Sequence, residues 1–141
     1  METKKLTATD LMVGDLVRQK HSGRVLRVSS FDPPYIREAN ELGQYKEDTI
    51  EPIPLTAEIL EKNGWKMCKS NVWRRIKIGC DEININLGEN YTQIEHLNMI
   101  YNPEDNAEVN YSSDFEYPRA IYVHELQHAL RMCGIEKEVV I

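Results

Sequence analysis

The residues whose types and spacing could best do chemistry lie near the carboxyl end, where the chain reads YVHELQHALRMCG over residues 122–134. His124 and His128 are four residues apart, so on a helix both project from one side and can share a zinc ion. Glu125 follows the first histidine, where it could deprotonate a metal-bound water. The pattern therefore permits a minimal zinc-dependent peptidase, with His124 and His128 as ligands and Glu125 as the general base.

A catalytic zinc site also needs a third protein ligand, and the sequence around the motif offers none in a familiar place. The extended metzincin pattern requires Gly and His where this chain has Arg131 and Gly134. The other candidates are two carboxylates downstream and two residues upstream in an unusual order: Glu136, Glu138, Glu95 and His96. The zinc hypothesis is therefore an alternative and not the favoured interpretation.

The same segment also fits an ordinary amphipathic helix. Val123, Leu126 and Leu130 follow the spacing of a buried stripe, which Cys133 continues. At about 100° per residue, the histidines point away from that stripe. We expect a surface helix whose imidazoles face water, with no catalytic residue, no cofactor and no metal, and with folding intact after His128→Ala. Adventitious or structural metal binding through the two histidines stays open.

Basic residues gather on the first predicted hairpin, where they could contact a phosphate backbone: Arg18, Lys20, His21, Arg24 and Arg27. Trp73, Arg75 and Lys77 share one face of a later strand and offer an aromatic ring beside two cations. A weak nucleic-acid-binding module is thus a second alternative. An exposed, solvated hairpin edge explains the same charges, and we favour it.

Charge and composition restrict the class of protein. The net charge is -6, and the excess of acid lies in residues 55–141, with 9 Lys/Arg against 14 Asp/Glu; residues 1–54 hold 8 against 9. This makes nucleic acid an unexpected partner. No apolar run approaches the ~20 residues that span a bilayer. The three cysteines lack a paired spacing. We expect reduced thiols, a cytoplasmic location, no membrane partner and another protein as the partner; the oligomeric state stays open.

Glycine and proline divide the first part of the chain into short strands. His21 to Gly23 forms a predicted hairpin loop between two β runs, a strand follows near residues 35–37, and another lies near residues 49–53. Pro52 and Pro54 indicate a boundary, because proline cannot donate to a ladder. The arrangement GD-x-V … G-R-V-x-x-V resembles the opening hairpin of SH3-like barrels, which implies an SH3-like β module over residues 1–54.

Residues 55–141 predict an α+β module. Thr56 begins a short helix as its N-cap and Gly64 ends it. An antiparallel meander follows, in which residues 82–87 alternate cleanly and residues 91–101 favour a strand. Residues 107–111 predict a further short strand, Pro118 lies in the first turn of the final helix, and residues 135–141 form a short tail strand. We expect the late aromatic residues to pack this helix on the meander, with an exposed partner site as the alternative: Tyr101, Tyr111, Phe115, Tyr117 and Tyr122.

Two segments, PIPLTAEILEKNGW and YVHELQHALRMCGIEKEVVI, resemble a group of small uncharacterised bacterial proteins associated with prophages and mobile elements of gut anaerobes. The final helix of that group reads Val-His-Glu/Gln-Leu-Gln-Asn/His, which implies that Glu125 and His128 are incidental to its pattern. The resemblance implies no known activity. The favoured interpretation is a non-enzymatic accessory or protein-interaction protein of a phage or mobile element.

Overall fold

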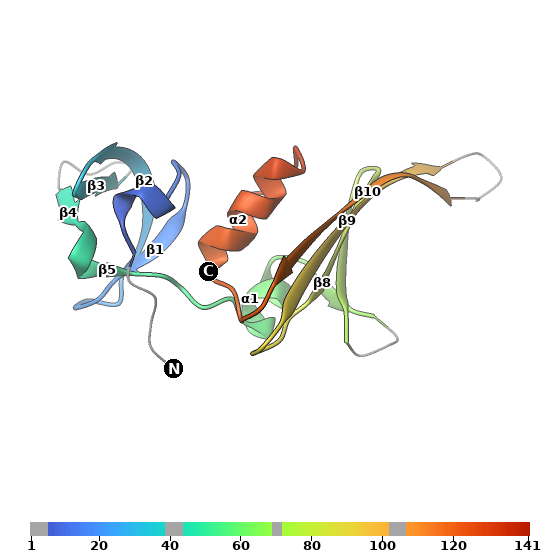
Figure 1. Cartoon of the computed structure of the whole chain (residues 1–141), viewed down its shortest axis with the longest axis horizontal. Helices are drawn as coiled ribbons and strands as arrows, with labels where there is room; N and C mark the ends of the chain where they lie inside the picture. The colour runs from blue at the N-terminus through green and yellow to red at the C-terminus, as the bar shows by residue number, and fades with distance from the viewer. Residues whose placement is uncertain (1–5, 39–43, 69–71, 102–106) are drawn as a thin grey trace. The chain divides into compact units, whose positions relative to one another are not determined.

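The computed structural model describes residues 6–38, 44–68, 72–101 and 107–141. The chain divides into two compact units. Residues 1–54 and 122–128 form the first, and residues 55–121 and 129–141 form the second. Among the described residues, each unit contains one five-stranded antiparallel sheet and the helices are few, so the fold is mostly β and compatible with the expected α+β class (Figure 1).

The first unit is built on the sheet β4-β3-β2-β1-β5. Its elements are η1 (Ala8–Asp10), β1 (Leu16–Gln19), β2 (Val25–Asp32), β3 (Tyr35–Glu38), β4 (Gln44–Lys46), η2 (Glu47–Thr49) and β5 (Ile50–Glu51). Gly23 has φ +70°, a conformation that glycine adopts without strain, and it closes the predicted β1–β2 hairpin. The sheet is not closed, so the predicted SH3-like barrel is not confirmed.

Apolar side chains from one face of this sheet and from η1 form the core of the first unit. The buried cluster comprises Leu6, Ala8, Leu11, Val17, Leu26, Val28, Ile36 and Ile50, with Phe31 and Tyr45 packed against it. Alternate residues of β2, Leu26 and Val28, enter this cluster because successive side chains of a strand point to opposite faces. The core therefore follows from the period-two pattern of the sequence.

The second unit is built on the meander β10-β9-β8-β7-β6. Its elements are α1 (Ala57–Lys62), β6 (Lys66–Met67), β7 (Arg74–Ile78), β8 (Asp81–Asn86), β9 (Thr92–Tyr101) and β10 (Ala107–Tyr117). The predicted N-cap is confirmed, because Thr56 Oγ1 accepts the N–H of Ile59 at 3.2 Å. Asn63 anchors the tail, donating to Val140 O and accepting its N–H, both at 2.8 Å.

Two boundaries near the carboxyl end differ from the prediction. β10 runs to Tyr117, and α2 begins only at Val123 and ends at Met132, so Pro118 lies in the connection and not in the helix. The predicted tail strand over residues 135–141 is wrong as well, because that segment has no ladder partner among the described residues. Pairing with β9 extends β10: Ser112, Ser113 and Asp114 have a partner opposite each of them.

Candidate functional site

The first half of α2 is hydrogen-bonded to the segment that opens β1. Gln127 Oε1 accepts the N–H of Leu16 at 2.9 Å, and its Nε2 donates to Gly14 O at 3.0 Å. One amide side chain therefore satisfies a donor and an acceptor of the main chain. Gln127 is buried, although the helical wheel assigns it no role in the core.

Asp15 is a fully buried carboxylate beside the same helix. Its Oδ2 accepts the N–H of Met12 at 2.8 Å and lies 2.6 Å from His128 Nε2. A buried carboxylate is costly unless hydrogen bonds replace its water, and His128 supplies one of them. The expectation that His128→Ala leaves folding intact therefore conflicts with this contact.

His124 is enclosed rather than solvated. His124 is 1% exposed. Its ring stacks on that of Tyr122 with the ring centroids 6.0 Å apart, and the ring of His128 meets it edge-on with the centroids 5.5 Å apart. The expectation that both imidazoles face water is therefore wrong for His124. The helical wheel counted only an apolar stripe, whereas α2 also buries polar residues that hydrogen-bond to the first unit.

Glu125, the general base of the zinc alternative, serves the helix terminus. Its Oε1 accepts the N–H of Tyr122 at 3.1 Å, the bond by which a residue in the first turn caps a helix. Within the described ranges, no three His, Cys, Asp or Glu side chains lie together so as to hold a metal ion. His124, Glu125 and His128 thus have packing, capping and hydrogen-bonding roles here.

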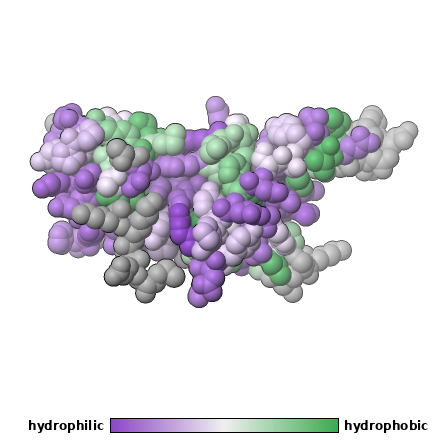
Figure 2. Space-filling model, in the orientation of Figure 1, coloured by the Kyte–Doolittle hydropathy of each residue, from purple (hydrophilic) through white to green (hydrophobic). Residues whose placement is uncertain are grey.

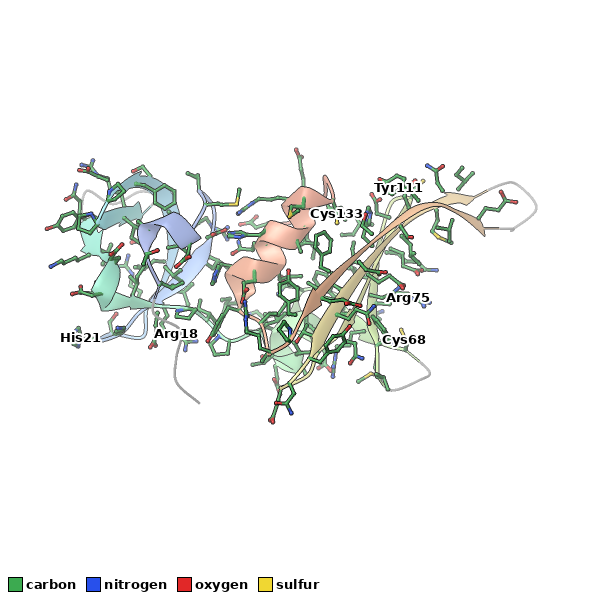
Figure 3. The ribbon with its side chains drawn as sticks, in the orientation of Figure 1. Arg18, His21, Cys68, Arg75, Tyr111 and Cys133 are labelled. Carbon is green, nitrogen blue, oxygen red and sulfur yellow. The ribbon has the colours of Figure 1, made fainter. Side chains whose placement is uncertain are left out.

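The cations of the first hairpin are partly engaged. Arg24 forms an ion pair with Glu38, and Arg27 donates to Gly14 O at 3.0 Å. Arg18, labelled in Figure 3, lies opposite Glu51 in the β1–β5 ladder. Lys20 is exposed just beyond β1. Of the four residues proposed as nucleic-acid contacts, Arg24 and Arg27 are therefore engaged within the first unit, and Arg18 lies opposite an acidic residue.

A polar cluster lies on one face of the second sheet. Asp81 Oδ1 accepts hydrogen bonds from His96 Nε2 at 2.8 Å and Asn98 Nδ2 at 3.0 Å, and these bonds lower the pKa of Asp81. Tyr111 meets the His96 ring edge-on at 5.5 Å. His96 was predicted to act only as an alternative metal ligand, whereas its alternation with Thr92 and Ile94 along β9 indicates that its side chain is buried.

The thiol of Cys133 has a raised pKa. Burial is the main cause and the charge of Asp81 adds to it, so the thiolate form that a nucleophile needs is disfavoured.

An open groove of about 860 Å³ lies at the β6 end of the second sheet. Its lining residues are Gly64, Lys66, Met67, Cys68, Arg75, Ile76 and Lys77. Figure 3 marks two of them, Cys68 and Arg75. Three are cations and none is acidic, so the groove favours an anion. Trp73, predicted to act with Arg75 and Lys77, is not among the lining residues.

The β9–β10 hairpin exposes large apolar side chains where it extends past β8. The β8–β9 ladder ends at Asn98, and beyond or beside it Ile100, Val109 and Tyr111 are 52%, 54% and 49% exposed. Figure 2 shows a hydrophobic surface on this part of the hairpin. Of the other late aromatic residues, Phe115, Tyr117 and Tyr122 are partly buried, whereas the side chain of Tyr101 lies outside the described residues.

Comparisons with known proteins found no matching family model, no matching curated protein and no matching solved structure. No helix in the described part of the chain is both long and apolar enough to cross a membrane.

Proposed function

We propose that this chain is a non-enzymatic protein-interaction protein, an accessory protein of a phage or mobile element, and that its β9–β10 hairpin binds the partner. The observation that carries the proposal is the half-exposure of Ile100, Val109 and Tyr111 at one end of that hairpin. The ladder register places Ile100 and Tyr111 on one face of the hairpin and Val109 on the other. Exposed apolar side chains on both faces of one strand end suit a partner that pairs along the edge of β10, and aromatic residues contribute strongly to such contacts.

The backbone of β10 supports the same proposal. β10 pairs with β9 on one side and is the last strand of the sheet order, so its other side offers N–H and C=O groups to an added strand. Its exposed charged residues, Glu108, Asp114 and Glu116, are all acidic. The partner is therefore an extended segment that carries apolar and basic side chains.

The first unit enters the proposal as an SH3-like module. The strand order β4-β3-β2-β1-β5, with the single turn η2 before β5, supports this. The engagement of Glu125 as a cap and of Arg24 and Arg27 inside the first unit weakens the zinc-peptidase and nucleic-acid alternatives.

A defined peptide tests the hairpin. We expect fluorescein-labelled Lys-Val-Lys-Val-Lys-Val to bind the full chain by fluorescence anisotropy, and Lys-Val-Lys-Pro-Lys-Val to bind at least about tenfold more weakly, because proline removes a ladder donor. Val109→Ser with Tyr111→Ser should reduce affinity for the first peptide by a similar factor, since both side chains are half exposed at the proposed contact.

Val140→Ser is the matched control, because Val140 is also exposed but lies outside the hairpin. Circular dichroism and urea unfolding confirm that each variant is folded. Equal affinity of the hairpin variant and the control for the alternating peptide, or no difference between the two peptides, contradicts the proposal.

A further inference from the structure

We propose that the groove at β6 and β7 is a second, independent binding site, which takes an extended acidic segment of a partner protein. The site lies at the opposite end of the sheet order from β10 and shares no residue with the hairpin surface. Its charge, its backbone and its apolar lining each support this assignment.

The cations of the groove are arranged on one face. Arg75 and Lys77 are two residues apart on β7, so they point to the same side of the sheet, and Lys66 lies opposite Arg75 in the β6–β7 ladder. Arg75 Nε donates to Asn84 Oδ1 at 2.9 Å and lies 3.5 Å from Glu82 Oε2. Lys77 lies opposite Glu82 in the β7–β8 ladder. Among the described residues, neither Lys66 nor Lys77 comes within ion-pair distance of a carboxylate, so both ammonium groups can contact an anionic ligand.

The backbone of β6 offers a pairing edge beside these cations. Cys68 donates its N–H to Trp73 O at 2.8 Å. Because neighbouring residues of a strand direct their N–H and C=O groups to opposite sides, those of Met67 are directed away from β7. An extended peptide can pair there while its carboxylates contact the lysines.

The lining favours a peptide over a single-stranded nucleic acid. A single-stranded nucleic acid is bound through aromatic side chains on which its bases stack, and none of the described lining residues is aromatic. It has Met67 and Ile76 instead, which suit the apolar side chains that alternate with acidic ones in an extended segment.

Protection of a native thiol provides a local test. Cys68 lines the groove, whereas Cys80 is exposed and does not. Saturating Glu-Val-Glu-Val-Glu-Val should slow alkylation of Cys68 by iodoacetamide at least about threefold and leave Cys80 unchanged, as measured by mass spectrometry of the digested chain. N-methylation of the central valine should remove most of the protection, because it removes a donor for strand pairing.

Charge reversal provides the second test. Lys66→Glu with Lys77→Glu should weaken binding of the fluorescein-labelled acidic peptide at least about tenfold. Lys20→Glu with Lys46→Glu makes the same change in net charge on exposed lysines of the first unit and should change the affinity less than about threefold. Binding of the Lys-Val hexapeptide at the hairpin should survive the groove substitutions.

Three results overturn the proposal. The first is equal loss of affinity in the groove variant and the control. The second is tighter binding of a ten-residue oligothymidylate than of the acidic peptide, which assigns the groove to nucleic acid. The third is concentration-dependent self-association, seen by sedimentation, that the groove substitutions abolish; it assigns the groove to a second copy of this chain.

Discussion

The two ends of the second sheet differ in length and in charge. β10 has eleven residues and pairs with β9 along its length, with exposed Glu108, Asp114 and Glu116. β6 has two residues and lies beside Lys66, Arg75 and Lys77. Like charges brought opposite each other destabilise strand pairing. Each end therefore disfavours pairing with its own kind and selects partners of opposite charge.

Between these ends, the interior strand β8 carries an amide, Asn84, whose donor and acceptor are both paired. Asn84 donates to Glu82 Oε2 and Glu95 Oε1, at 3.2 Å and 3.0 Å, and accepts from Arg75. Because buried polar groups must be satisfied inside the protein, these side chains are committed to the fold. The binding capacity of the sheet therefore lies at its ends, where Lys66 and Lys77 form no ion pair with a described residue and where β6 and β10 each pair with a described strand on one side alone.

The largest expected effect is on the free energy of unfolding, and it distinguishes a buried residue of the β9–β10 hairpin from an exposed one. Ile94→Ala on β9 should lower the free energy of unfolding by about 2–5 kcal/mol, because Ile94 is 1% exposed and lies between Ile85 and Phe115. Ile100→Ala is the matched control on the same strand, and it should cost less than about 0.5 kcal/mol. Urea unfolding measures both. Similar losses for the two variants would show that the end of the hairpin belongs to the core.

At the basic end, Arg75 should matter to the fold and Lys77 should not. Arg75→Ala removes the donor to Asn84 and the charge beside buried Glu82, at a cost of about 1–3 kcal/mol of unfolding free energy. Lys77→Ala should stay within about 0.5 kcal/mol. Denaturant titration distinguishes them, and a larger loss for Lys77→Ala would contradict the division of roles within the groove.

The lowered pKa of Asp81, the first residue of β8, predicts that the stability of the fold depends on pH. The pKa of Asp81 is lowered in the folded state, mainly by the Asn98 hydrogen bond, so its carboxylate stabilises the fold above the pKa of an unfolded aspartate. This contribution disappears as pH falls through the lowered folded-state pKa. Asp81→Asn should cost about 1–2 kcal/mol at pH 7, and the difference from wild type should shrink below about pH 4. Urea unfolding over a pH series tests it; a constant difference would exclude the charge as the cause.

The smallest expected effect is a change in the pKa of Tyr91, which responds to the acidic residues of β10. A hydrogen bond with Glu116 raises the pKa of Tyr91, and the charge of Asp114 adds to this. Glu116→Gln should therefore move the pKa of Tyr91 back toward its usual value, and Asp114→Asn should move it less. Ultraviolet titration of tyrosinate measures the shift. An unchanged titration in Glu116→Gln would indicate that the two side chains are not in contact.

Local sequence signals predicted much of the fold. Gly23 between two β runs indicated the first hairpin, Thr56 indicated the start of α1, and the alternation of residues 82–87 indicated β8. Each signal acts through neighbours in the chain, by backbone conformation, capping or strand period. Such signals are present in the sequence whatever the distant contacts are.

The distant contacts decided the rest. Ser112, Ser113 and Asp114 read as the approach to a helix, yet pairing with β9 made them strand. The pattern around His124 and Glu125 suggested chemistry, whereas burial beside Tyr122 and a capping bond gave them structural roles. The groove of Lys66 and Lys77 exists only because β6 and β7 lie side by side. Composition and period by themselves indicated most of the elements. Whether residues 112–114 form a strand, which polar groups are buried and which charges meet all depend on residues far apart in the chain, because desolvation and strand pairing require the folded surroundings.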